Sequence, residues 1–331
     1  MTPDQVAAGT EQFTADAEQF AADTEPFRRE LLAHCYRMLG SVHDAEDLVQ
    51  ETYLRAWRGY GEFEARSSMR TWLYRIATNT CLNALEHSSR RMLPSGLGGP
   101  ETDPLRPRAT ADASVAWLEP VPDALTAADP AAIVAAREGL RLALIASLQY
   151  LPATQRAVLI LRDVLGFPAA EVAGLLGIST AAVKSALQRA RARLHQLGLA
   201  ADDVSEPEDP QARALLDEYI AAFEKSDSAA LERLLRADST LEATPWRTWF
   251  AGAVTCVPFL RAQVMGPPGT WRMLPTGANG QPAAASYYRD EEGRYQAYGI
   301  LVLTVTAGRI SRAVSFGDPA LVPVFGFPPA L

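Results

Sequence analysis

The sequence has 331 residues, of which 39 are acidic and 31 are basic, so its formal net charge is −8. A hydrophobic content of 48% is enough to build packed cores and excludes a wholly disordered chain. No apolar run approaches the ~20 residues that span a bilayer, and no basic-then-apolar leader is present, so we expect a cytoplasmic protein with no membrane partner. Cys35, Cys81 and Cys256 are far apart in the sequence and indicate neither a disulfide framework nor a metal site, and no cofactor is predicted.

The charge is distributed in blocks, and these blocks predict the domain organisation. The net charges are −6, +2, −4, +5 and −5 over residues 1–25, 26–92, 93–129, 130–200 and 201–331. Proline and glycine concentrate in residues 93–125, and residues 201–210 are acidic with two prolines, so both segments are expected to be flexible. We therefore expect an acidic N-terminal extension (1–25), a basic domain (26–92), an acidic linker (93–129), a second basic domain (130–200), an acidic hinge (201–209) and a C-terminal domain (210–331).

The first basic block is typical of a helical bundle. A helical pattern over residues 44–60 places Leu48, Val49, Leu54 and Trp57 on one face and Glu46, Asp47, Gln50 and Glu51 on the other. A further helix is expected over residues 69–87. Its flanks are rich in arginine, and it carries Trp72, Tyr74, Asn79 and Asn83. Bases, aromatics and amides together can grip a phosphate backbone and unstacked bases, although a solvated basic face of an ordinary bundle gives the same pattern.

The second basic block predicts a helix-turn-helix. A helix starting at Leu151-Pro152 is followed by a short helix from Pro168 to Leu176, a glycine turn at Gly177, and a basic helix from about 181 to 195 that Ser179 or Thr180 can cap. The exposed front of the last helix is expected to carry Lys184, Ser185, Gln188 and Arg189, with Val183 and Leu187 facing the core. Such a helix can enter a major groove, although plain structural hairpins share this outline.

The C-terminal third predicts an α+β domain. Two helices are expected over residues 210–236 and a third over 252–264, followed by an antiparallel sheet of strands over 271–275, 283–289, 298–306 and 310–316. Aromatic residues that could line a ligand pocket are Trp246, Trp249, Phe250, Trp271 and Tyr298. An isomerase-type site would need a carboxylate base such as Asp238 or Asp290 and a donor such as Tyr287 or Tyr298. Because Asp290 lies in a turn-like acidic run, we expect no enzyme.

Three stretches resemble bacterial sigma factors of the extracytoplasmic-function group. Residues 44–57 resemble the motif that binds core RNA polymerase, 70–79 the segment that opens and reads the −10 promoter element, and 151–194 the segment that reads the −35 element. The resemblance implies that core RNA polymerase and promoter DNA are partners, with contacts to the clamp helices of the largest subunit and the flap of the second. It also implies that the acidic linker threads positively charged polymerase channels. By position it implies these roles: Asp47, Gln50 and Glu51 for core polymerase; Phe63, Arg70, Trp72, Arg75, Asn79 and Asn83 for the −10 element; Lys184, Ser185, Gln188 and Arg189 for the −35 element.

The C-terminal third resembles SnoaL-like, ketosteroid-isomerase-like cone domains. Its stretches over residues 274–282 and 325–328 resemble actinobacterial sigma factors of the SigG-like group that carry this extension. The expected fold is thus multidomain: two all-α sigma domains, the second with a helix-turn-helix, and an α+β cone domain. The leading hypothesis is a sigma factor regulated in cis by its C-terminal domain, which could bind a small ligand or a protein. We expect this acidic domain to pack against both basic domains in the free protein. The alternatives are a one-component, ligand-sensing helix-turn-helix regulator and an isomerase-like enzyme fused to a DNA-binding module.

Overall fold

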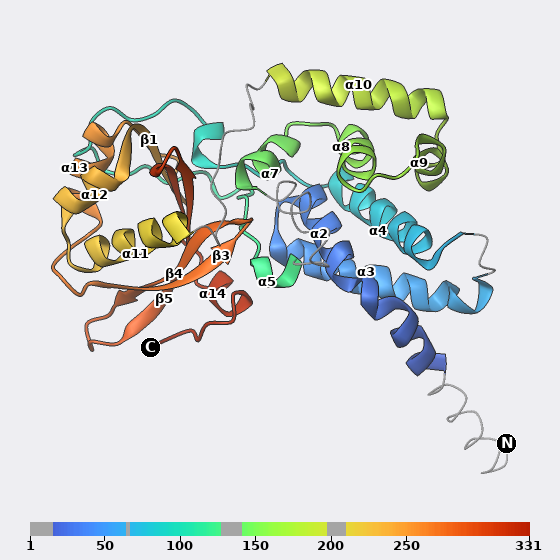
Figure 1. The fold of residues 1–331 in the computed structure, drawn as a ribbon, viewed down its shortest axis with the longest axis horizontal. Coiled ribbons are helices and arrows are strands. Elements are labelled where there is room, and N and C mark those ends of the chain that lie inside the picture. Colours follow the sequence, from blue (N-terminus) through green and yellow to red (C-terminus); the bar gives the residue numbers. More distant parts are fainter. Residues whose placement is uncertain (1–15, 64–66, 127–140, 197–209) are drawn as a thin grey trace, which may run out of the picture.

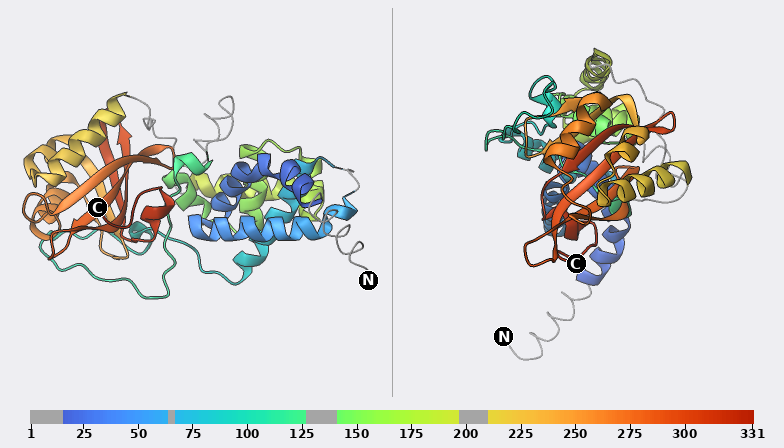
Figure 2. Two further views of the ribbon diagram at one scale, coloured as in Figure 1. Left: turned by 90° about the horizontal axis from the view of Figure 1, so that it is seen from below. Right: turned by 90° about the vertical axis from the view of Figure 1, so that its left-hand side faces the viewer.

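The computed structural model describes residues 16–63, 67–126, 141–196 and 210–331. Two helical domains lie side by side, and an α+β domain sits at one end of them (Figures 1 and 2). The acidic hinge predicted over residues 201–209 lies outside the described residues, as do residues 127–129 of the predicted acidic linker. So do residues 1–15 of the predicted N-terminal extension, while residues 16–24 form a helix.

The first helical domain follows the local signals in its sequence. After the helix over 16–24 come η1 (Glu25–Phe27), α2 (Arg28–Leu39), α3 (Val42–Gly59), η2 (Tyr60–Glu62) and α4 (Met69–Glu86). α2 ends at Gly40, which adopts a left-handed φ of 73°. The Ser41 side chain then accepts a hydrogen bond from Asp44 N (3.1 Å) and begins α3, and Ser68 does the same for Thr71 N (3.1 Å) at the start of α4.

The second helical domain contains the predicted helix-turn-helix. Its elements are α7 (Leu142–Leu148), α8 (Ala153–Leu159), the π-helical turn η5 (Ile160–Val164), α9 (Ala169–Leu176) and α10 (Thr180–Gln196). Gly177 makes the left-handed turn between α9 and α10 with φ 64°, and the Ser179 hydroxyl accepts a hydrogen bond from Ala182 N (3.1 Å). The glycine turn and the capped helix are therefore as predicted.

The C-terminal domain is α+β, as predicted, and contains one sheet. Its helices are α11 (Pro210–Glu224), α12 (Ser228–Leu234), α13 (Ala253–Gln263) and α14 (Leu321–Val324). Its strands are β1 (Leu235–Thr244), β2 (Phe250–Ala251), β3 (Trp271–Ala278), β4 (Gln281–Arg289), β5 (Tyr295–Thr306) and β6 (Arg309–Phe316), in the order β2-β1-β6-β5-β4-β3. The expectation of a purely antiparallel sheet was wrong, because β1, which has no clear alternation of apolar and polar residues, pairs in parallel with β6.

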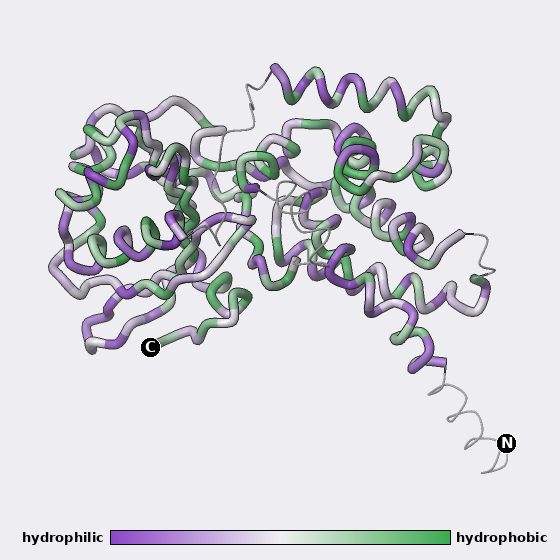
Figure 3. The backbone as a smooth tube through the Cα atoms, viewed as in Figure 1, coloured by the Kyte–Doolittle hydropathy of each residue, from purple (hydrophilic) through white to green (hydrophobic). Residues whose placement is uncertain are grey.

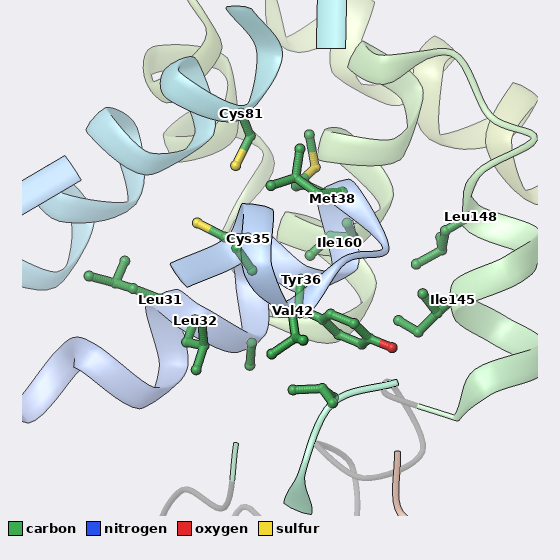
Figure 4. Close-up of a cluster of buried hydrophobic side chains, with 14 of the residues drawn as sticks. Leu31, Leu32, Cys35, Tyr36, Met38, Val42, Cys81, Ile145, Leu148 and Ile160 are labelled. Atoms are coloured by element: carbon green, nitrogen blue, oxygen red, sulfur yellow. The ribbon is translucent and has the colours of Figure 1, made fainter. Parts of the chain in front are cut away.

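Two apolar cores hold the molecule together. One lies inside the C-terminal domain, between the sheet and α11, α12 and α13. The other is continuous across both helical domains and the opposite face of the sheet. Helix α2 lies at its centre: Figure 4 shows Cys35, Tyr36 and Met38 of α2 surrounded by side chains that include Ile145 and Ile160 of the second helical domain. The tube coloured by hydropathy shows α10 alternating between polar and apolar turns, as expected for a helix with one exposed face (Figure 3).

The linker is docked rather than loose over residues 93–126. It leaves α4, passes through η3 (Pro94–Gly96), runs along the C-terminal domain and returns to the helical domains at α5 (Asp123–Thr126) (Figures 1 and 2). Backbone hydrogen bonds fix it to the C-terminal domain, from Glu101 N to Trp249 O (2.8 Å) and from Arg247 N to Ala109 O (3.0 Å). The expectation of a flexible tether was therefore wrong for this part of the chain, because backbone pairing leaves no signature in composition.

Among the described residues, no single helix is both long and apolar enough to cross a membrane. Within that part of the chain, α9 and α10 taken together have the length and composition of a membrane span, but the two helices are bent by 100° at the turn between them.

Candidate functional site

Helix α3 presents an exposed, mostly acidic surface. Asp47 and Gln50 are exposed, and Glu51 is half-buried and paired with Arg55 (2.7 Å). Leu54 was expected to face the core, but its side chain is 53% exposed and lies one turn beyond Gln50 and Glu51. We call Asp47, Gln50, Glu51 and Leu54 the α3 surface: an apolar residue beside acids and an amide, as in a protein-binding face.

Helix α4 presents a polar stripe. Arg75, Asn79 and Asn83 are all exposed and recur every four residues, so they lie above one another on one face of the helix. One cation and two amides in line can donate several hydrogen bonds to a nucleic-acid strand. The stripe contains three of the six residues predicted for the −10 element.

The other three predicted −10 residues are less accessible. Arg70 pairs with Glu30 (2.9 Å), and its guanidinium lies 4.9 Å from the ring centre of Tyr74 and 4.9 Å from that of Phe167. Trp72 was expected to offer a stacking surface, but it is only 8% exposed, because it falls on the inward side of α4 beside Leu73. It packs instead under half-buried Phe63, with ring centres 4.8 Å apart.

The recognition helix α10 is exposed along its predicted front. Lys184, Ser185, Gln188 and Arg189 are all exposed, whereas Val183, Ala186 and Ala190 are buried. A hydrogen bond joins the Arg189 guanidinium to the Ser185 hydroxyl. The Asp163 carboxylate, in η5, accepts two hydrogen bonds from Arg191 of α10 (2.8 and 2.7 Å). The four predicted −35 residues therefore share one accessible face.

The two helical domains contact each other directly through α4 and α9. The Thr71 hydroxyl donates to Glu171 Oε1 (2.6 Å), and Tyr74 meets Phe167 edge-on with ring centres 5.2 Å apart. Arg70, whose guanidinium also lies over Phe167, is held in the same contact. The side of α4 that carries Arg70, Thr71 and Tyr74 is thus partly covered by the second helical domain.

Arg156 is a buried link between the same two domains. It is 4% exposed, and its guanidinium donates to Met38 O near the end of α2, to Gln149 Oε1 (2.8 Å) and to the carbonyls of Gln149 and Leu151 (both 3.2 Å). Burial lowers the pKa of Arg156 to about 10. Because carbonyl oxygens at a helix C-terminus carry partial negative charge, they can hold this cation without a carboxylate.

A buried polar junction joins the C-terminal domain, the linker and α2. Asn279, fully buried in the turn between β3 and β4, donates to Tyr36 OH (2.8 Å) and accepts from Val121 N (3.1 Å). Tyr36 OH in turn donates to Glu119 O (2.8 Å). Burial, as the largest cause, raises the pKa of Tyr36, so its hydroxyl stays protonated as a donor. We call Tyr36, Glu119, Val121 and Asn279 the junction.

Two further contacts surround the junction. Leu142 N at the start of α7 donates to buried Gln281 Oε1 (3.0 Å), which ties the C-terminal domain to the second helical domain. The Glu119 carboxylate accepts from the Ser41 hydroxyl (2.7 Å) and lies 3.1 Å from His43 Nδ1. The C-terminal domain therefore packs on both helical domains, as expected. The contacts described here between it and the helical domains are made by neutral amides, a phenol and apolar side chains.

The interior of the C-terminal domain does not assemble the acids considered for an isomerase. Asp238 pairs with Arg236 at the surface (2.8 Å), and Asp290 accepts from Arg294 N and Gln296 Nε2 within its turn (both 2.8 Å). Hydrogen bonds, from Arg236 and Gln296 respectively, lower the pKa of both acids. Tyr287 donates to Pro328 O (2.8 Å) on the far side of the sheet. Over residues 16–63, 67–126, 141–196 and 210–331, no group of three or more His, Cys, Asp or Glu is placed to hold a metal ion.

Several residues that matter here carried no sequence signal. Asn279 and Tyr36 are 243 residues apart, so no local pattern joins them. Cys35 and Cys81 also meet: Figure 4 shows their sulfurs facing each other between α2 and α4. The Asn279-Gly280 pair was the one available hint, because asparagine followed by glycine favours turns with the positive φ that Asn279 adopts (57°).

An exposed front on the helix-turn-helix, a stripe of one cation and two amides on α4, and a separate α3 surface with an exposed leucine are features typical of a DNA-binding protein that works with a protein partner. Sigma-70 region 2 matches residues 24–91, and sigma-70 region 4 matches residues 141–194. The ECF RNA polymerase sigma factor SigG of Mycobacterium tuberculosis is 51% identical over 307 residues, which cover 92% of this chain and 82% of that protein. SigJ of the same organism is 34% identical over 215 residues, 64% of this chain and 61% of that protein.

The chain belongs to the extracytoplasmic-function RNA polymerase sigma factors, and its SigG-like character is confirmed. The family is not enzymatic: its members bind core RNA polymerase and promoter DNA and direct transcription initiation. The crystal structure of M. tuberculosis SigJ superposes with a TM-score of 0.62 at 25% identity, covering 93% of this chain and 99% of that one. The predicted fold class, two helical sigma domains and an α+β SnoaL-like domain, is confirmed.

Proposed function

We propose that the described conformation is a closed, inactive form of the sigma factor, which the C-terminal domain holds shut until core polymerase separates its parts. The observation that carries this proposal is the direct contact between α4 and α9. Promoter elements at −10 and −35 are about 25 base pairs apart, which is roughly 85 Å along B-form DNA. Helices that touch cannot read both elements at once. Region 2 and region 4 must therefore separate before transcription can be initiated.

The division of labour follows the sequence. We take residues 1–25, 26–92, 93–129, 130–200, 201–209 and 210–331 as extension, region 2, linker, region 4, hinge and regulatory domain. The α3 surface docks on the clamp helices of the largest polymerase subunit, and region 4 docks on the flap of the second. Accessibility of Asp47, Gln50 and Leu54 in the closed form supports a first encounter with polymerase at this surface.

Promoter opening is assigned to α4 and the residues before it. Phe63 and Asn79 hold a flipped non-template base, with Trp72 supporting Phe63 from below. Arg70, Arg75 and Asn83 hold the strand backbone. Each base–aromatic stack stabilises an unstacked base by about 1–3 kcal/mol, which offsets the cost of flipping it. Arg70 pairs with Glu30 and lies over Phe167 of region 4. It can therefore contact the strand backbone fully only after region 4 leaves α4.

Recognition of the −35 element is assigned to the exposed front of α10. Lys184 and Arg189 can contact phosphates or guanine edges, and Ser185 and Gln188 can hydrogen-bond to base edges or phosphates. All four are accessible in the closed form. The free protein cannot read a whole promoter because region 4 is held against α4, and not because α10 itself is covered.

The C-terminal domain acts as a lock rather than an enzyme. Its Asn279 hydrogen-bonds to Tyr36 of region 2 and to Val121 of the linker. Its Gln281 hydrogen-bonds to Leu142 of region 4. Among the described residues, no carboxylate lines the aromatic cavity of this domain, which supports a non-catalytic role. A small ligand or a protein partner at this domain would act by changing the stability of the lock.

Run-off transcription with core polymerase on a cognate promoter tests the proposal. A variant with a weakened junction should need less sigma factor for half-maximal product than the natural sequence does. If the variant releases its C-terminal domain but needs as much sigma factor for half-maximal product as the natural sequence does, the C-terminal domain is not a lock.

A further inference from the structure

An apolar cavity that is partly open to solvent lies in the C-terminal domain. Aromatic side chains from α11, α13, β3 and β5 make up much of its wall: Tyr219, Phe223, Phe259, Trp271 and Tyr298. Trp271 and Tyr298 meet edge-on with ring centres 5.0 Å apart. Such a wall favours an apolar guest.

Hydroxyl groups without partners interrupt this wall. Ser286 on β4 is 3% exposed and Ser315 on β6 is half-buried, and both line the cavity. Within the part of the chain that the structure describes, neither hydroxyl makes a hydrogen bond to protein. Both hydroxyls open into the cavity, where each can donate and accept hydrogen bonds. A guest that hydrogen-bonds to them would take the place of water.

The linker supplies a cation at the same cavity. Arg108 lines it, and its guanidinium stacks 4.2 Å from the ring centre of Trp246. No carboxylate lies within ion-pairing distance of Arg108 among the described residues. Its neighbour Arg106, by contrast, pairs with Glu101 (3.1 Å). A cation beside an apolar cavity, stacked but not ion-paired, is suited to an anionic group on the guest.

We propose that this cavity binds an apolar monocarboxylate, a medium-chain fatty acid or an arylalkanoic acid. Its carboxylate pairs with Arg108 and its apolar part lies among the aromatic residues. Ser286 and Ser315 provide the remaining polar contacts. The site therefore consists of the C-terminal domain and one residue of the linker.

Binding at this site stabilises the docked linker. The segment that carries Arg108 is held by bonds from Ala109 N to Thr248 Oγ1 (2.8 Å) and from Ala111 N to Pro245 O (3.3 Å). A ligand that needs Arg108 binds the docked form, so at a concentration of 100 times its Kd it favours that form by about a hundredfold. This second step rests on the proposed function: the ligand would act as an inhibitor of initiation.

Isothermal titration calorimetry on the full-length protein tests the site, with octanoate, decanoate and phenylbutyrate as probes and octanol as the uncharged control. At least one carboxylate should bind one-to-one, and octanol should bind more weakly than octanoate. Arg108→Ala should weaken binding at least tenfold, Ser286→Ala should weaken it a few-fold, and Arg106→Ala should leave it unchanged. Absence of binding by all three carboxylates, or equal affinity in the Arg108→Ala protein, would overturn the site.

Run-off transcription separates this inference from the proposed function. With the natural sequence, the bound carboxylate should lower the yield of product, and the same ligand should not lower the yield obtained with Arg108→Ala. Measured binding with unchanged transcription would refute the coupling to the linker. Absence of transcription without any ligand would instead contradict the proposed function.

Discussion

Replacing Asn279 with glycine should open the closed form. The Asn279 amide bonds to the linker at Val121 N (3.1 Å) and to α2 at Tyr36 OH (2.8 Å), and the residue has a φ of 57°. Glycine accepts this φ without strain, so Asn279→Gly removes the amide alone. Alanine would add the steric cost of a left-handed conformation and confuse the two effects.

The magnitude follows from what each partner loses. Val121 is fully buried, so its N–H would be left without an acceptor, at a cost of about 1–3 kcal/mol. Tyr36 OH keeps Glu119 O as its acceptor (2.8 Å), so losing the Asn279 donor costs only about 1 kcal/mol. The sum, about 2–4 kcal/mol, shifts docking toward the open form by roughly 30- to 1,000-fold, since ~1.4 kcal/mol is a factor of ten.

Hydrogen–deuterium exchange of the free protein measures this shift. Amides of residues 116–123 and of the start of α7 should exchange faster in Asn279→Gly, while the centres of α3 and β5 keep their protection. Ala307→Gly is the matched control, because Ala307 also has a positive φ (51°) but is exposed in the turn between β5 and β6. Unchanged exchange in the linker of Asn279→Gly, or equal acceleration in Ala307→Gly, would refute the role of the junction.

Three further predictions concern the binding surfaces and the core. Leu54→Asp should lower affinity for core polymerase at least tenfold without changing the free energy of unfolding by more than about 0.5 kcal/mol, because Leu54 is exposed; unaltered core binding would remove it from the interface. Arg189→Ala should cost about 1–3 kcal/mol on the preferred −35 sequence if it reads a base, whereas a uniform loss with a shallower salt dependence would identify a phosphate contact. Burial, with Arg37 and Arg70 nearby, lowers the pKa of His34 from 6.5 to about 3. As the pH falls below 6.5, His34 therefore takes up a proton in the unfolded chain but not in the folded protein. The free energy of unfolding should fall by ~1.4 kcal/mol per pH unit between pH 6.5 and pH 3. His34→Gln should flatten that slope in urea titrations, and an equal slope in both proteins would contradict a neutral buried His34.

Local patterns predicted the helices and the recognition face well. Helical periodicity located α3, α4 and α9, and Gly177 with the predicted cap at Ser179 or Thr180 located α10. The four predicted −35 residues share one exposed face of α10. These signals are local, because a cap or a turn involves residues only three or four apart. Four of the six strands were recognised from their β-branched and apolar runs, whereas β1 and β2 were missed because their pairing depends on distant partners.

The particular contacts that make the closed arrangement could not be predicted, because they join residues that are far apart in the sequence. Tyr36 pairs with Asn279 across 243 residues, and Leu142 with Gln281 across 139. Composition suggested a loose linker, but bonds such as Glu101 N to Trp249 O involve the backbone alone. The exposure of Leu54 and the burial of Trp72 were also misjudged, since helical spacing defines a face but not which neighbours cover it.

The separation of region 2 from region 4 can be measured directly by fluorescence energy transfer. The native Cys35, Cys81 and Cys256 are buried, so dyes can be placed on cysteines introduced at exposed Glu86 and Arg193. The free protein should show one high-efficiency population, and core polymerase with promoter DNA should convert it to low efficiency, because the two elements lie roughly 85 Å apart. The same efficiency in the free protein and in the promoter complex would contradict a closed form that opens to initiate transcription.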